Sequence, residues 1–164
     1  MNEINALSLQ KTPFEMIGKD WMLITAGDEK KYNTMTASWG GLGVLWNKNV
    51  VFAFVRPQRF TCDFLFDSEY FSLSFLGDEY RDVLSYCGKY SGRDVDKAKE
   101  CNITPDFSQN APFSKESETV IICKKLYVQQ MNEESVIDES IKSNYSGDDY
   151  HHVFVGEIVK VLQK

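Results

Sequence analysis

The chain has 164 residues, of which 43% are hydrophobic and 26% charged, and its formal net charge is −6. A chain of this length buries about two-thirds of the surface that it exposes when unfolded, so we expect one domain over residues 1–164, stable without a metal or disulfide. The acidic balance argues against binding to nucleic acid or to a membrane surface, because both need a basic face.

The cysteines, the first residues and the longest apolar run indicate where in the cell the protein is expected. The four cysteines form no C-x-x-C pair, which favours reduced thiols that pack as small apolar side chains. The first ten residues lack the basic start and apolar core of a signal peptide. The longest apolar run, residues 50–55, is far shorter than the ~20 residues of a membrane span. We therefore expect a cytoplasmic protein.

The first half of the chain predicts strands. Short strands are expected over residues 16–18, 21–26 and 35–38, the last two joined as a hairpin by a polar turn. The continuous run over residues 50–55 suits a strand buried on both faces or a barrel wall. Pro57 has no backbone donor, so it marks the exit of that strand.

The second half predicts short helices between further strands. Capping residues indicate helices over 62–67 after Thr61, over 79–88 after Asp78 with Gly88 at its end, and through 98 after Asp94, and a weaker pattern indicates a helix over 137–145. Strands are expected over 70–76 (half-buried), 119–130 and 153–161, and a covering loop over 102–115. With no β-α-β-α rhythm, these elements predict a mainly β fold, an antiparallel barrel with short helices.

Residues 33–61 contain the most informative cluster. Gly40, Gly41 and Gly43 follow Ser38 and Trp39, and glycine lets a backbone approach a flat ligand closely because it has no Cβ.

Cationic residues follow this glycine cluster. Arg56, Arg59 and Thr61 stand where a strand ends and a helix begins, an arrangement suited to an anion. Lys89 and Arg93 add positive charge in an acidic chain. Together with the glycines, these features suggest a planar, phosphorylated cofactor.

Taken singly, each feature has a structural explanation. Trp39 and Gly40 fit an ordinary turn beside a core tryptophan, Arg56 and Arg59 fit surface ion pairs, and Ser91–Arg93 fits a plain loop.

The sequence contains no set of residues that predicts a catalytic side chain. The pair His151–His152 predicts no metal site, because neighbours on a strand face opposite ways and no ligand lies at a suitable spacing. No Ser-His-Asp set or pair of acids is evident, so the sequence does not favour hydrolysis.

Five motifs in order resemble one family. T-A-S-W-G-G (36–41), F-V-R-P-Q-R-F-T (54–61), Y-R-D-V-L-S-Y-C-G (80–88), Y-S-G-R-D (90–94) and V-G-E-I (155–158) resemble the flavin reductase-like, FMN-binding split-barrel proteins, and among them the flavoredoxin-type branch. The resemblance implies a Greek-key split β-barrel and a homodimer with FMN at the interface. It also implies electron transfer between NADH or NADPH, FMN and an acceptor.

The resemblance also implies which residues contact FMN. It assigns the isoalloxazine ring to the backbone and hydroxyls of Thr36, Ala37, Ser38, Trp39 and Gly40. It assigns the phosphate and ribityl chain to Arg56, Arg59, Thr61, Ser91, Gly92 and Arg93, and it adds Pro57, Phe60 and Lys89 to the cofactor-binding set.

Three functions stay open at this point. The first is an oxidoreductase that reduces a flavin or protein acceptor with NADH or NADPH. The second is an FMN-binding electron carrier that only a redox partner protein reduces. The third is a ligand-binding barrel without flavin. The sequence identifies neither the preferred nicotinamide nor the acceptor.

Overall fold

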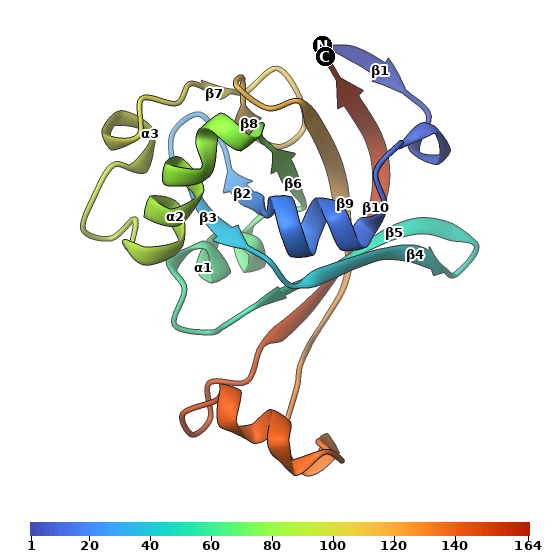
Figure 1. Cartoon of the computed structure of the whole chain (residues 1–164), viewed down its shortest axis with the longest axis vertical. Helices are drawn as coiled ribbons and strands as arrows, with labels where there is room; N and C mark the ends of the chain where they lie inside the picture. Colours follow the sequence, from blue (N-terminus) through green and yellow to red (C-terminus); the bar gives the residue numbers. More distant parts are fainter.

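The computed structural model describes all 164 residues and is built on one antiparallel sheet of eight strands (Figure 1). Along the sheet, seven of them follow the order β3 (Tyr32–Ala37), β2 (Met22–Gly27), β6 (Tyr70–Phe75), β9 (Thr119–Gln130), β10 (His152–Gln163), β5 (Lys48–Val55) and β4 (Gly40–Leu45). Strand β1 (Asn2–Ile4) pairs with β10, which brings the two termini together. The mainly β architecture with short helices is thus confirmed.

Short helices surround the curved sheet. They are α1 (Phe60–Asp67), α2 (Arg81–Lys89), α3 (Lys97–Glu100), the π-helix η2 (Phe14–Asp20) and the 3-10 turns η1 (Ala6–Ser8), η3 (Asp78–Tyr80), η4 (Glu133–Ser135) and η5 (Glu139–Asn144). In Figure 1, α1, α2 and α3 gather beside β3, whereas η5 lies in the connection from β9 to β10 and projects away from the barrel. No helix is long and apolar enough to cross a membrane.

Alternation along β2 divides the core in two. Met22 and Ile24 point into the main barrel cluster, which also contains Phe71 of β6 and Phe154 of β10. Leu23 points the other way and packs in a smaller cluster with Leu84 and Cys87 of α2. Because successive side chains of a strand face opposite ways, one apolar strand holds both the barrel and α2 in place.

The predicted strand over residues 16–18 is wrong, because these residues lie in η2. Thr12 and Glu15 form the reciprocal bonds of a capping box: the Thr12 N–H donates to Glu15 Oε2 at 3.0 Å and the Glu15 N–H to Thr12 Oγ1 at 3.3 Å. Pro13 between them suits a helix start. The T-P-F-E pattern was a helix signal that the apolar residues after it obscured.

The glycine stretch forms strand β4, which the sequence pattern did not predict. It pairs with β5 through a tight turn whose two residues, Trp46 and Asn47, have φ angles of 53° and 57°. A Cβ on Gly41 or Gly43 would lie 3.6 Å from the Phe52 ring, at ordinary contact distance. These two glycines therefore pack against a neighbouring strand.

The strand over 70–76 is confirmed as β6 (Tyr70–Phe75), but it is buried on both faces rather than half-buried. Its polar face lies under the 102–115 segment, which contains the short strands β7 (Pro105–Asp106) and β8 (Phe113–Ser114). Ser72 Oγ donates to Pro112 O at 2.6 Å, and the Ser114 N–H donates to Ser74 Oγ at 3.4 Å. The expected covering loop thus covers β6 itself.

Three predicted helix caps are displaced by one or more residues. Thr61 lies inside α1, whose N-cap is Arg59, and Asp78 begins η3 instead of α2. Asp96, not Asp94, caps α3 and accepts from the Lys99 N–H at 3.2 Å.

Later elements also differ in detail from their expected bounds. Helix α2 continues through Gly88 to Lys89, so Gly88 does not end it. The weak helix expected over 137–145 is the 3-10 turn η5 (Glu139–Asn144). The expected strands over 119–130 and 153–161 are confirmed as β9 and β10.

Candidate functional site

Two adjoining pockets lie where β3, the N-terminus of α1 and the C-terminus of α2 meet. The first, which we call the polar pocket, has a volume of about 70 Å³ and is lined by predicted site residues Arg59, Phe60, Thr61, Lys89, Ser91 and Gly92. The second, the open pocket, has a volume of about 220 Å³ and is lined by Thr36, Ala37, Ser38, Trp39, Arg56 and Arg59. Met35 and Arg59 line both, so the two pockets adjoin.

Three predicted site residues, Gly40, Pro57 and Arg93, line neither pocket. A Cβ on Gly40 would lie 2.8 Å from Phe52 O, so the close approach that this glycine permits is to β5. Gly92 makes the close approach inside the site, since its added Cβ would lie 1.8 Å from Asn33 Oδ1. Glycine is therefore needed at position 92 for the packing of the polar pocket, and at position 40 for the packing of β4 against β5.

The wall of the open pocket comes from the end of β3. The chain leaves β3 after Ala37, and Thr36 Oγ1 near the strand end donates to Leu84 O of α2 at 2.6 Å. This bond fixes the strand end against α2. The Trp39 side chain stays 47% exposed, so the pocket opens toward the surface.

The N-terminus of α1 faces the polar pocket. Its N-cap is Arg59 and no side chain caps it, while Phe60 and Thr61 of the first turn line the pocket. Thr61 is fully buried, and its Oγ1 accepts a hydrogen bond from Asn33 Nδ2 at 2.7 Å. The partial positive charge of a helix N-terminus therefore faces this pocket.

Two buried or half-buried cations of the polar pocket have no carboxylate partner. Arg59 donates through Nη1 to Gly88 O at 2.7 Å, and burial, then nearby Arg56, lowers its pKa. Lys97 is only 5% exposed and donates to Thr34 O at 2.8 Å and Cys87 O at 2.9 Å. Burial lowers the pKa of Lys97 to about 8. Neither residue forms a salt bridge, so the pocket holds uncompensated positive charge.

The other two arginines are already paired. Arg56 donates to Asp149 Oδ2 at 2.7 Å and lies 5.3 Å from the ring centroid of Tyr145. Arg93 donates to Asp63 Oδ2 at 2.7 Å and stacks on Phe60 at 4.5 Å. The surface ion pairs considered for Arg56 thus exist, whereas Arg59 has none.

Sequence reasoning missed seven residues that line the two pockets. Three of them form the contacts discussed below, namely Asn33, Lys97 and His151, and the other four are Met35, Phe54, Gln58 and Tyr90. Nothing local to Asn33 or Lys97 signals its burial. His151 lines the open pocket 5.2 Å from the Trp39 ring, and its Nδ1 lies 3.0 Å from Tyr145 Oη. Burial, then Arg56, lowers the pKa of His151 to about 4, so the imidazole is neutral at neutral pH. The sequence suggests no role for the histidine pair beyond a metal site that its spacing disfavours, and the structure places His151 in the pocket wall.

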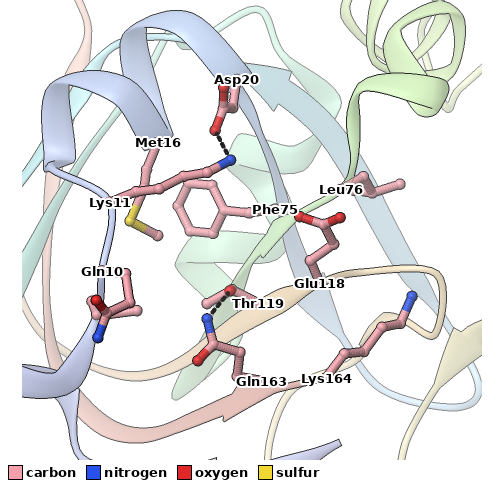
Figure 2. A pocket seen from close by; sticks show the side chains of 11 residues that line it. Gln10, Lys11, Met16, Asp20, Phe75, Leu76, Glu118, Thr119, Gln163 and Lys164 are labelled. Atoms are coloured by element: carbon pink, nitrogen blue, oxygen red, sulfur yellow. Dashed lines mark hydrogen bonds and ion pairs between the residues drawn. The ribbon is translucent and has the colours of Figure 1, made fainter.

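A separate pocket near the termini differs in its electrostatics. It has a volume of about 340 Å³, and Figure 2 shows Lys11 reaching Asp20 across it, with N–O distance 2.7 Å. Lys164 Nζ, also in its lining, donates to Glu116 O at 2.7 Å. Lys11 is thus neutralised by a carboxylate, in contrast to Arg59 and Lys97.

Comparison with known proteins identifies the family and the fold of the chain. The chain belongs to the family described as "Flavin reductase like domain", whose family model matches residues 16–164. The comparison with curated proteins found no match.

Three solved structures share the fold across nearly the whole chain. Flavoredoxin from Methanosarcina acetivorans is 19% identical with a TM-score of 0.72, covering 100% of this chain and 76% of that one. An FMN-binding protein from Thermus thermophilus with bound p-hydroxybenzaldehyde is 21% identical with a TM-score of 0.70, covering 100% and 82%. A split-barrel-domain protein from Shewanella frigidimarina NCIMB 400 is 18% identical with a TM-score of 0.70, covering 89% and 67%. The split-barrel class is therefore confirmed.

Proposed function

We propose that this protein binds FMN and acts as an oxidoreductase of the flavin reductase or flavoredoxin type. The observation that carries the proposal is the uncompensated charge of Arg59 and Lys97 beside the N-terminus of α1. A phosphate group carries about −1.5 to −2 charges at pH 7 and accepts several hydrogen bonds, which matches what these groups lack. The FMN-binding and flavoredoxin structures that share the fold support the same cofactor.

In this proposal, each pocket receives one end of the cofactor. The polar pocket holds the phosphate through Arg59, Thr61, Lys89, Ser91 and Gly92. The open pocket receives the ring along residues 36–39, whose end is fixed by the bond from Thr36 to Leu84 O. Bound FMN supplies the hydride and electron chemistry, while the protein supplies position and electrostatics.

The paired arginines keep supporting roles. Arg56 borders the open pocket and holds residues 144–149 against it through Asp149 and Asn144 O. Arg93 joins the 91–93 loop to α1 through Asp63. His151 is neutral, so it offers a hydrogen-bonding group without charge at the ring end. Arg56 is then the only charged residue that lines the open pocket and not the polar pocket.

We further propose that NADH or NADPH reduces the cofactor and that a second copy of the chain completes the open pocket. The openness of this pocket beside exposed Trp39 supports a homodimer with FMN at its interface. The four free cysteines support a cytoplasmic location, where thiols stay reduced. The electron acceptor is a flavin or a redox partner protein.

The test is the visible absorption spectrum of the purified protein, before and after anaerobic addition of NADH and then NADPH. A flavin spectrum that bleaches with either nicotinamide supports the oxidoreductase and identifies its donor. A flavin spectrum that persists with both, but bleaches with a flavoprotein reductase, indicates the electron carrier. A colourless protein with no affinity for added FMN contradicts the proposal.

A further inference from the structure

Lys97 is held in an unusual way for a lysine. It is the first residue of α3, it is 5% exposed, and its ammonium donates to one carbonyl of β3 and one of α2. An ammonium group has three N–H donors, so one donor remains. Because Lys97 also lines the polar pocket, that donor is available to whatever occupies it.

Burial of this ammonium is costly unless an anion offsets it. A buried charge is normally paired with an opposite charge, and Lys97 has only two neutral carbonyls. The carbonyls of Thr34 and Cys87 fix the position of Nζ, since they belong to separate elements of the core. The result is a preorganised cation with its compensating partner missing.

We propose that Lys97 contacts the phosphate of the flavin and takes up a proton as the phosphate binds, so that this residue makes the site selective for phosphorylated flavins. The inference rests on the proposed function, because it assumes that FMN occupies the polar pocket. It adds a residue and a linked proton that the sequence motifs do not indicate. At neutral pH Lys97 is already mostly the ammonium ion. Above about pH 8, where the free protein holds it mainly as the neutral amine, the proton comes from solvent and converts that amine to the ammonium ion.

The groups around Lys97 favour this linkage. Besides burial, Arg59, which lines the same pocket, lowers the pKa of Lys97, and Lys89 also lines that pocket. Asp96 accepts a hydrogen bond from the Lys99 N–H as the helix cap. Burial raises the pKa of the Cys87 thiol to about 12 and also raises that of Cys101, so neither thiol ionises near pH 8.

Without an anion, burial and Arg59 hold the pKa of Lys97 at about 8. A phosphate dianion within contact distance raises that pKa toward the ordinary lysine value of 10.5. Between the two values the complex binds more protons than the free protein. Affinity for FMN therefore falls by up to about tenfold for each pH unit above about pH 8.

The experiment is calorimetric titration of FMN, and separately riboflavin, into the flavin-free protein at pH 7 and pH 9. Each titration is repeated in buffers of different ionisation enthalpy, which gives the number of protons taken up. We expect little uptake with FMN at pH 7 and close to one proton at pH 9. Riboflavin, which shares the ring titration but has no phosphate, is expected to give none at either pH.

Lys97→Met removes the charge while keeping an unbranched side chain, and Lys99→Met changes an exposed lysine of the same helix as its control. We expect Lys97→Met to weaken FMN about ten- to hundredfold, to leave riboflavin nearly unchanged and to abolish proton uptake. Lys99→Met should behave as the unaltered protein. The uptake measurement on the unaltered protein needs no variant, so poor folding of Lys97→Met does not remove the test.

The outcomes separate this inference from the proposed function. Failure of FMN to bind at either pH overturns the proposed function. Tight FMN binding without proton uptake at pH 9 overturns the role of Lys97 alone. Equal weakening of FMN and riboflavin by Lys97→Met also overturns it, because that pattern indicates a purely structural link between β3 and α2.

Discussion

Asn33 on β3 and Thr61 in the first turn of α1 are joined by a buried hydrogen bond of 2.7 Å, from Nδ2 to Oγ1. The two residues are 28 positions apart in sequence. Their bond fixes the N-terminus of α1 against the sheet, and Gly92 packs directly on the same Asn33 side chain. One asparagine thus sets the relative positions of three segments around the polar pocket.

Replacement of Asn33 by alanine should lower the free energy of unfolding by about 1–3 kcal/mol, because the buried Thr61 hydroxyl loses its donor. Urea denaturation measures this change. Asn110→Ala, at an exposed position, is the matched control and should shift the free energy by less than about 0.5 kcal/mol. Equal effects of the two variants would show that the hydrogen bond between Asn33 and Thr61 makes no specific contribution to the free energy of unfolding.

Arg59→Ala should weaken FMN more than riboflavin, since it removes a charge-assisted phosphate contact worth roughly 1.5–3 kcal/mol. Fluorescence titration with each flavin measures the two dissociation constants. Arg81→Ala is a suitable control because Arg81 contacts Lys19 O and Trp21, outside both pockets. The same loss for both flavins would show that Arg59 does not contact the phosphate.

Gly92→Ala should disturb the polar pocket, because the new Cβ would lie 1.8 Å from Asn33 Oδ1 and force one of the two to move. We expect a loss of stability of about 1–3 kcal/mol together with weaker FMN binding. Gly18→Ala meets nothing within 4 Å and should leave both unchanged. Thermal denaturation and flavin titration of the two variants test the contrast, and an unaffected Gly92→Ala would contradict the packing.

His151 should titrate far below an ordinary histidine, with a pKa of about 4. The unfolded chain, with a histidine pKa near 6.5, binds more protons between these values. Stability contributed by neutral His151 is therefore present above about pH 6.5 and is lost as the pH falls toward 4. NMR titration of the imidazole resonances, assigned with His151→Gln, measures the value, and a midpoint near 6.5 would contradict the burial of this ring.

The sequence predicted the site where the signal was local. Arg59 and Thr61 follow a strand exit marked by Pro57, and they lie at the N-terminus of α1 as that pattern predicts. The N-cap is Arg59, two residues before the predicted Thr61. The short apolar run 16–18 misled because Met16 and Ile17 are both buried in η2, and two adjacent buried residues suit a strand as well as a helix.

The missed residues depend on contacts between distant segments. Lysine is usually exposed, so nothing in the sequence indicates that Lys97 is buried. Its burial results from the packing of α3 against β3 and α2. The glycines at 40, 41 and 43 belong to a motif of the family, but the predicted reason for them, close approach to a ligand, is incomplete. In the structure their missing Cβ atoms allow close packing of β4 against β5. Local patterns therefore indicated the anion, and tertiary structure determined which cations remain free to bind it.

The connection between β9 and β10 reaches the open pocket, where its last residue, His151, forms part of the wall. Arg56 reaches Asp149 and Asn144 O, and Tyr145 Oη meets His151 Nδ1, while the polar pocket receives no residue from this connection. In the proposed function, this connection therefore contributes to the ring end of the site and not to the phosphate end. Exchange of residues 132–149 is therefore expected to change what approaches the ring while the proposed phosphate contacts stay in place, because none of these residues lines the polar pocket.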